Sequence, residues 1–276
     1  RRLMIARALT AAVFLVGGGC SMPPGPAATP DEVAAIERGS YTLPGVPGAA
    51  VSYLRAGARD GRRVIFVHGT PGEAAGWADY LLHVPAGFEY VAIDRPGFGQ
   101  SRPGDAEPSL TRQAAALAPL LVERAGAWPI LVGHSLGGPV VARAAVDRPG
   151  RIGGLLILAG SLDPALERVH PMQPVGEWWG VRDALPRHLR NANRELLPLK
   201  GELDLLAPHL EEIKLPVTII HGTTDTLVPV ANVAFMRSHL TGASPLKVEL
   251  LARQGHFLPW EHRDAIERAL AQMVAQ

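Results

Sequence analysis

Short apolar runs alternate with amphipathic stretches along most of this chain. Buried strands that alternate with helices are typical of a mainly parallel sheet covered by helices on both faces, so the predicted fold class is α/β. The apolar runs predict strands at residues 63–67, 90–93, 128–132, 154–159, 216–220 and 246–251, with an early edge strand at residues 49–56. The amphipathic stretches predict helices at residues 31–39, 109–125, 231–240 and 260–274, and one from residue 139 to near residue 149.

The alternation is lost between residues 161 and 214. This segment contains Trp178, Trp179 and scattered prolines, and it predicts a mostly helical insertion that caps the sheet. We therefore expect one domain over residues 41–276 with a cap insertion at residues 161–214. Parallel sheets place their binding sites at the carboxyl ends of the strands, so polar residues that follow the strands are the candidates for chemistry.

The first residues form a separate unit. Three arginines within residues 1–7 precede a short apolar run, and together they resemble a secretory signal peptide over residues 1–19. A proline-rich tether and a short helix are expected over residues 20–40. Cys20, the chain's one cysteine, stands where bacterial lipoprotein signals place their lipidated residue, which implies an exported protein with an N-terminal lipid anchor in a membrane. Gly17 stands where that pattern usually has leucine, so ordinary cleavage, with a periplasmic or secreted product and an unmodified thiol, stays open.

The amino-acid composition argues against several classes of function. Apolar residues make up 47% of the 276 residues, enough for one large core. The formal net charge is +1, which gives no electrostatic argument for nucleic acid. The ten histidines form no His-Glu-x-x-His pattern, and a single cysteine excludes a cysteine-rich zinc or disulfide framework. We expect neither a metal nor a cofactor, and the sequence does not indicate an oligomeric state.

Gly133-His134-Ser135-Leu136-Gly137 lies between a predicted strand and a predicted helix. A serine in such a sharp turn needs glycine on both sides, because a Cβ would collide with the turn. Gly-x-Ser-x-Gly in this context is the nucleophile-elbow pattern. The simpler alternative is a loop at a helix start in which Ser135 is only an N-cap.

Three further motifs follow predicted strands. Together with the elbow they resemble the α/β-hydrolase superfamily, over residues from about 45 to the C-terminus. That resemblance implies an α/β-hydrolase fold with Ser135 as nucleophile, His256 as base and Asp225 as the acid that orients it. The motifs are His68-Gly69-Thr70-Pro71-Gly72, residues 94–101, and His221-Gly222-Thr223-Thr224-Asp225 with Gly255-His256.

The resemblance also suggests supporting roles. The backbone N–H groups of Thr70 and Leu136 are the expected oxyanion-hole donors. His68 and the turn that begins at Asp94 and Arg95 are expected to brace the site rather than react. Some superfamily members take the acid from an earlier loop, and Asp163 occupies that position here. We favour Asp225, because Asp163 directly precedes Pro164, where an aspartate commonly caps a helix.

Serine at the elbow suits acyl transfer, whereas related epoxide hydrolases and dehalogenases use aspartate there. The expected function is a serine hydrolase that cleaves a small or medium apolar acyl substrate, most simply a carboxylic ester. Trp178 and Trp179 are candidates for lining the acyl pocket, although ordinary packing of the cap is an alternative for them. The same triad would also serve a C–C hydrolase, lactonase, amidase or perhydrolase. A non-catalytic binding protein on the same fold is the alternative from another class.

Overall fold

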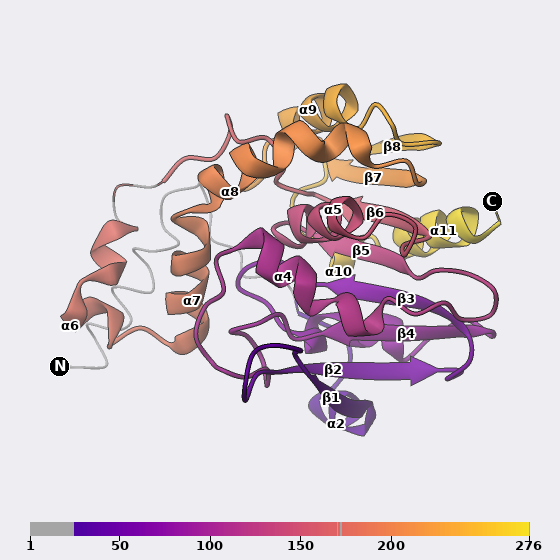
Figure 1. The fold of residues 1–276 in the computed structure, drawn as a ribbon, viewed down its shortest axis with the longest axis horizontal. Helices are drawn as coiled ribbons and strands as arrows, with labels where there is room; N and C mark the ends of the chain where they lie inside the picture. Colours follow the sequence, from indigo (N-terminus) through magenta and orange to yellow (C-terminus); the bar gives the residue numbers. More distant parts are fainter. Residues whose placement is uncertain (1–24, 170, 172, 276) are drawn as a thin grey trace.

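The computed structural model describes residues 25–169, 171 and 173–275 (Figure 1). The expected signal peptide, Cys20 and the first part of the expected tether lie outside these residues. In the described part of the chain, no helix is both long enough and apolar enough to cross a bilayer. Within the same residues, no group of three or more His, Cys, Asp or Glu side chains is arranged to hold a metal ion.

An eight-stranded sheet forms the centre of the described structure, with the strand order β1-β2-β4-β3-β5-β6-β7-β8. The strands from β3 onward pair in parallel, whereas β1 and β2 add an antiparallel edge next to β4. The predicted mainly parallel α/β sheet is therefore confirmed. The strands are β1 Glu37–Thr42, β2 Ala50–Gly57, β3 Arg62–Val67, β4 Phe88–Ile93, β5 Ile130–His134, β6 Gly154–Leu158, β7 Val217–Gly222 and β8 Leu246–Leu251.

Helices cover both faces of this sheet, as the unbroken apolar character of its strands requires. Along β3, Ile65 and Val67 join one hydrophobic cluster while Val64 and Phe66 join the other, because successive side chains point to opposite faces. The helices are α2 Pro30–Ala35, α3 Ala78–Leu81, α4 Leu110–Ala116, α5 Gly137–Asp147, α6 Trp179–Arg182, α7 Arg187–Leu196, α8 Leu199–Leu206, α9 Ala231–His239, α10 Leu258–Glu261 and α11 Arg263–Val274. Short 3₁₀ turns lie at Ala74–Trp77, Ala118–Leu120, Pro174–Glu177 and Ala207–Glu212.

The N-terminal part of the described chain differs from the expectation of a tether up to residue 40. Its backbone docks on the domain, since the N–H groups of Ala27 and Ala28 donate to the Asp79 carboxylate at 2.8 and 2.9 Å. Residues 37–42 form the edge strand β1, so the strand predicted at residues 49–56 lies inside the sheet as β2. The polar composition of β1 concealed it, because only one face of an edge strand needs to be apolar.

Three predicted helices differ from the expectation. The helix predicted at residues 31–39 ends at Ala35, because residues 37–39 belong to β1. The helix predicted at residues 109–125 ends at Ala116 and continues as a 3₁₀ turn that contains Pro119. Proline lacks the backbone N–H and restricts the residue before it, which explains the early end. The helix predicted at residues 260–274 is divided into α10 and α11 at His262, whose backbone is non-helical.

The segment between β6 and β7 contains only helices, 3₁₀ turns and loops in its described residues. Figure 1 shows α6 and α7 beyond one end of the sheet, with α8 leading back toward β7. We refer to this segment as the cap. Its position places it over the carboxyl ends of the parallel strands, where the candidate residues follow.

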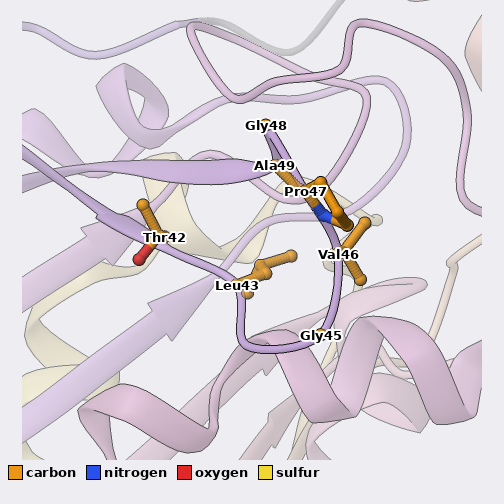
Figure 2. Close-up of a pocket in the computed structure, with 7 residues that line it drawn as sticks. All are labelled: Thr42, Leu43, Gly45, Val46, Pro47, Gly48 and Ala49. Carbon is orange, nitrogen blue, oxygen red and sulfur yellow. The ribbon is translucent and has the colours of Figure 1, made fainter.

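A surface hollow of about 310 Å³ lies at the loop between β1 and β2 (Figure 2). It is lined by Thr42, Leu43 and residues 45–49, none of which has a titratable side chain. Strands β2, β4 and β3 separate this hairpin from β5. The hollow is therefore distinct from the candidate site.

Asp94, at the end of β4, joins three segments of the chain. Its Oδ1 accepts the N–H of Ala74 at 2.8 Å. Its Oδ2 accepts the N–H of Gln100 at 3.0 Å and an N–H of Arg38 at 2.8 Å. The side chain is 1% exposed, so these bonds are shielded from water. This geometry agrees with the expectation that Asp94 braces the strand edge.

We predict that Asp94→Asn destabilises the fold, because its amide presents N–H groups where the carboxylate accepts only hydrogen bonds. Loss of these charge-assisted bonds is expected to cost about 2–4 kcal/mol of unfolding free energy, or roughly 5–15 °C in Tm for a chain of this size. Thermal melts by circular dichroism measure the shift. The exposed Asp60→Asn is the matched control, and equal melting temperatures for the two variants would contradict a bracing role.

Candidate active site

Ser135 occupies the turn between β5 and α5. Its φ of +55° lies in the left-handed region, which a residue with a side chain adopts only where the surroundings enforce it. Two backbone bonds hold the turn: Ser135 N–H donates to the Leu158 carbonyl at 2.9 Å, and the Ser135 carbonyl accepts the N–H of Gly138 at 2.9 Å. The side chain is only partly buried, so its hydroxyl lies at the strand edge with some access to solvent.

The two elbow glycines are required by close backbone approach. A Cβ on Gly133 would collide with the Gly137 carbonyl, and a Cβ on Gly137 would collide with the Val67 carbonyl at the end of β3. The start of α5 therefore lies directly against the ends of β3 and β5. This is the strand–turn–helix context that the sequence pattern predicted for Ser135.

His256 and Asp225 meet at the same strand edge. His256 Nδ1 lies 2.7 Å from Asp225 Oδ2, and both residues are buried. Asp225 follows β7 and His256 follows β8, and these strands are parallel neighbours, so their loops emerge side by side. With Nδ1–H donated to the carboxylate, Nε2 is left to accept a proton.

The Asp225 carboxylate is held as an ion. Its Oδ1 accepts the N–H groups of Leu227 at 2.9 Å and Val228 at 2.8 Å. Burial alone would raise the pKa of Asp225, but the hydrogen bonds from His256 and Val228 outweigh it and hold that pKa below its usual range. An ionised carboxylate at this position fixes the orientation of the His256 ring.

Asp163 is placed differently. Its Oδ1 accepts the N–H of Ala165 at 2.9 Å, which is the local turn expected before Pro164. Its backbone N–H donates to Asn232 Oδ1 at 2.8 Å. Among the described residues, no hydrogen bond or ion pair joins Asp163 to His256. The geometry thus brings Asp225, and not Asp163, to the histidine.

Thr70 and Leu136 frame the space beside Ser135. A Cβ on Gly69 would lie 2.8 Å from the Ser135 Cβ, so the loop that contains Thr70 runs against the serine. Leu136 is the residue that leads into α5. In the described part of the chain, no acceptor takes the N–H of either Thr70 or Leu136. Two unengaged donors next to a serine are what an oxyanion hole requires.

Three further histidines surround the site, and each donates a ring N–H to a backbone carbonyl. His68 bonds Gly69 at 2.7 Å, His134 bonds His256 at 3.0 Å, and His221 bonds Val228 at 2.9 Å. Burial lowers the pKa of all three, that of His134 to about 3. They are therefore neutral near pH 7, and they hold the loops without adding charge beside the site.

Sequence reasoning missed His134 and His221. Both directly neighbour or end a strand that leads into a motif, and that position is the signal that could have identified them. His134 also packs against His256, with 4.8 Å between ring centroids. Because its Nε2–H bonds the His256 carbonyl, His134 fixes the backbone of the residue that carries the candidate base.

Trp178 and Trp179 do not form an enclosed pocket. Their side chains are 65% and 83% exposed, and Figure 1 places α6 at the end of the cap away from the sheet. The prediction that they line an acyl pocket has no support in this structure, and we leave them out of the proposed site. The cause is the short length of α6, which has no buried residue.

A comparison with protein families identifies the class that this fold and site define. The family model for the alpha/beta hydrolase fold matches residues 62–207, more than half of the chain. The chain belongs to the α/β-hydrolase family. The match includes the loop after β3, the elbow and most of the cap.

Individual relatives agree with this assignment. The chain is 26% identical to a 2-hydroxy-6-oxononadienedioate/2-hydroxy-6-oxononatrienedioate hydrolase of Comamonas testosteroni, over 79% of this chain and 89% of that protein. It is 36% identical to an acetyltransferase component of the acetoin cleaving system of Cupriavidus necator, but over only 41% of this chain and 30% of that protein. A putative aryl esterase from Burkholderia cenocepacia has a similar fold, with a TM-score of 0.67 and 22% identity over 87% of this chain and 98% of that one. The family and the named hydrolases among its relatives identify the protein as an α/β-hydrolase enzyme.

The neutral His134 predicts a pH dependence of stability. In the unfolded chain a histidine binds a proton below about pH 6.5, whereas buried His134 stays neutral down to about pH 3. The folded state therefore loses stability as the pH falls, and between pH 7 and 5 this residue is expected to remove about 2 kcal/mol of unfolding free energy. His134→Gln retains an amide N–H and does not titrate, so its stability should fall less over that interval.

Urea unfolding at pH 7 and pH 5 measures this difference. His209→Gln is the control, because His209 lies at the surface. If both substitutions flatten the pH dependence equally, burial of a neutral His134 is not its cause.

Proposed function

We propose that this α/β-hydrolase is a serine hydrolase that cleaves carboxylic esters with a small or medium apolar acyl group. The observation that carries the proposal is the 2.7 Å contact between His256 Nδ1 and Asp225 Oδ2, at the strand edge where Ser135 sits in its left-handed turn. A neutral hydroxyl is a poor nucleophile without a base that is itself held in place. The proposed roles are Ser135 as nucleophile, His256 as base and Asp225 as the acid that orients His256.

In the first half of the proposed reaction, the Ser135 hydroxyl adds to the ester carbonyl while its proton passes to His256 Nε2. The N–H groups of Thr70 and Leu136 hold the oxyanion that forms. His256 then gives the proton to the leaving alcohol as the C–O bond breaks, which leaves an acyl-enzyme. In the second half, water gives a proton to His256 and adds to the acyl carbon. The bond between the acyl carbon and the Ser135 oxygen then breaks, the proton on His256 returns to Ser135, and the carboxylic acid is released.

An uncharged acyl substrate fits the charges of the cap. Arg194 bonds Glu177 at 3.0 Å and Arg182 bonds Asp183 at 3.0 Å. Arg187 donates to the Gly99 carbonyl at 2.5 Å. Arg194 and Arg182 face carboxylates, so they offer little attraction to an anionic substrate, whereas the neutral Gly99 carbonyl leaves the charge of Arg187 uncompensated.

A second candidate is hydrolysis of a C–C bond in a dienoic keto acid. It is favoured by the names of relatives that align over 74–79% of this chain, which are 2-hydroxy-6-oxononadienedioate/2-hydroxy-6-oxononatrienedioate hydrolases and a 2-hydroxy-6-oxo-6-phenylhexa-2,4-dienoate hydrolase. Such substrates are anionic, so the cap arginines described above would have to bind the substrate carboxylate. Lactonase, amidase and perhydrolase activities would use the same proposed triad.

A substrate panel separates these candidates. We expect p-nitrophenyl esters of two to eight carbons to be hydrolysed with a higher kcat/KM than lactones, anilides or 2-hydroxy-6-oxo-6-phenylhexa-2,4-dienoate. A higher kcat/KM for the dienoate would replace the esterase proposal with the C–C hydrolase. Lipidation of Cys20 and attachment to a membrane remain proposals from the sequence, since that residue lies outside the described structure.

We predict that Ser135→Ala abolishes ester turnover and labelling by a fluorophosphonate probe, while Tm changes by only a few degrees. The turn is enforced by its glycines and backbone bonds, so the hydroxyl can be removed without loss of the fold. Residual turnover above roughly 1% of wild type would argue against Ser135 as nucleophile. Ser161→Ala is the matched control, because Ser161 is a neighbouring serine whose N–H bonds the Ser135 carbonyl at 3.4 Å. This variant should still be labelled by the probe.

We further predict opposite effects at the two candidate acids. Asp225→Asn should lower kcat by about 10⁴-fold in a folded protein, because the neutral amide no longer selects the His256 tautomer that leaves Nε2 unprotonated. Asp163→Asn removes only a local turn contact and should change stability by about 1 kcal/mol with little effect on kcat. Steady-state kinetics and thermal melts of both variants measure the contrast. The reverse pattern would assign the acid to Asp163.

A further inference from the structure

Arg95 and Glu195 form a buried ion pair between the core and the cap. Arg95 follows β4, and Glu195 lies on α7 of the cap. The Arg95 guanidinium bonds both Glu195 oxygens, at 2.8 and 3.0 Å, with side chains that are 0% and 1% exposed. Gln113 of α4 completes the contact: its Nε2 donates to Glu195 Oε1 at 2.9 Å, and its Oε1 accepts from Arg95.

The remaining donors of Arg95 hold the loop beside Ser135. Its Nε–H donates to the His68 carbonyl at 2.8 Å, and its Nη2 donates to the Gly69 carbonyl at 2.8 Å. With the two bonds to Glu195 and the one to Gln113, all five N–H groups of the guanidinium have an acceptor. Such complete pairing is the condition under which a buried charge is tolerated.

The bond to the Gly69 carbonyl also determines the direction of a catalytic donor. The Gly69 C=O and the Thr70 N–H belong to one peptide unit, which is planar, so in a trans unit they point in opposite directions. Holding the carbonyl toward Arg95 therefore turns the Thr70 N–H away from Arg95. The Ser135 Cβ lies 2.8 Å from the position that a Cβ on Gly69 would occupy, so this loop runs directly against the serine.

We propose that Glu195 is a positioning residue of the cap, which acts through Arg95 to hold the His68–Gly69–Thr70 peptides in the orientation that the oxyanion hole requires. The inference rests on the proposed serine-hydrolase function. It links docking of α7 to assembly of the site: when Glu195 is in place, the Arg95 guanidinium is fixed in the plane that reaches both loop carbonyls. Without it, Arg95 loses its charge partner, and the bond from the His68 ring is left as the main restraint on the Gly69 carbonyl, so the Gly69–Thr70 peptide is held less firmly.

A second cap residue provides a matched comparison. Asn191 lies one turn earlier on α7 and is 1% exposed. Its Nδ2 donates to the carbonyls of Gly97 and Gly104, at 2.7 and 2.8 Å. Asn191 thus ties the same helix to the core through a different loop, and it has no hydrogen bond to residues 68–70 in the described structure. A general loss of cap docking would affect Asn191 and Glu195 variants alike.

The experiment compares Glu195→Gln with Asn191→Ala in the full chain, with p-nitrophenyl butyrate as substrate and an alkyl trifluoromethyl ketone as inhibitor. The ketone adds to the nucleophilic serine and carries an oxyanion, so its affinity reports the hole itself. We expect Glu195→Gln to lower kcat by roughly 10- to 100-fold with KM within about 3-fold, because displaced donors weaken transition-state binding. The inhibition constant should rise by the same factor as kcat/KM falls. Asn191→Ala should lower Tm while kcat and the inhibition constant stay within about 3-fold of wild type.

The double variant Arg95→Met/Glu195→Met tests the proposal even if Glu195→Gln does not fold. Removing both charges leaves no unpaired buried ion, so it should melt above the single variant. The His68 carbonyl loses its Arg95 donor and the Gly69 carbonyl keeps only the bond from the His68 ring, so kcat and ketone affinity should remain low. Recovery of kcat in the double variant would overturn the positioning role.

Two other results decide between the proposals. If wild type is labelled at Ser135 by a fluorophosphonate but Glu195→Gln and Asn191→Ala have equal kcat and equal ketone affinity, the positioning role is wrong and the hydrolase function stands. If wild type is not labelled at Ser135 and does not bind the ketone, the proposed function fails and the positioning role fails with it.

Discussion

The close approach between the start of α5 and the ends of β3 and β5 is the constraint on which the site depends. No side chain fits on Gly133 or Gly137, since a neighbouring carbonyl occupies the place of each Cβ. This approach holds Ser135 in a left-handed turn at the strand edge and, among the described residues, leaves the Leu136 N–H without an acceptor. The loops after β7 and β8 reach the same edge because all these strands are parallel. The tight turn thus fixes the position of Ser135, and the other candidate residues lie on loops at the same edge of the sheet.

Neutral hydrogen-bond donors hold the loops around this turn. His134 and His221 each give a ring N–H to a loop carbonyl, and burial keeps both uncharged near pH 7. A neutral imidazole satisfies a buried carbonyl without the desolvation cost of a charge. Arg95 is the contrasting case, a buried cation that faces Glu195 and two loop carbonyls. The Asp225 carboxylate is held separately, by the N–H groups of Leu227 and Val228 and by the His256 ring.

The cap has two distinct regions. Helix α7 is tied to the core through Asn191 and Glu195, both almost fully buried. Helix α6 has no buried residue, and its tryptophans face solvent. The names of the relatives describe different substrates, although these proteins share the α/β-hydrolase core. We therefore expect their differences in substrate to arise in the cap and in the loops at the carboxyl ends of the strands. In this protein Glu195 of the docked part bonds Arg95, and Arg95 bonds the His68 and Gly69 carbonyls of the loop that carries Thr70, so the cap is linked to that loop.

Much of the core was determined by local sequence. Apolar runs predicted β3 to β7, because a strand covered on both faces must be mostly apolar along its length. Edge strand β8 was predicted from a run that mixes apolar residues with Lys247 and Glu249. The elbow glycines indicated the turn at Ser135, since Gly-x-Ser-x-Gly is a local pattern, although the contact that requires Gly137 is made with the distant Val67 carbonyl. Edge strand β1 was missed because its outer face is polar, and the helix after Ser109 was overextended past Pro119. Local sequence already favoured Asp225 over Asp163, and the tertiary structure places the Asp225 carboxylate against His256. Tertiary structure alone decided that Trp178 and Trp179 face solvent and that Glu195 meets Arg95. Each of these depends on how distant segments pack together, and no local pattern of residues records that packing.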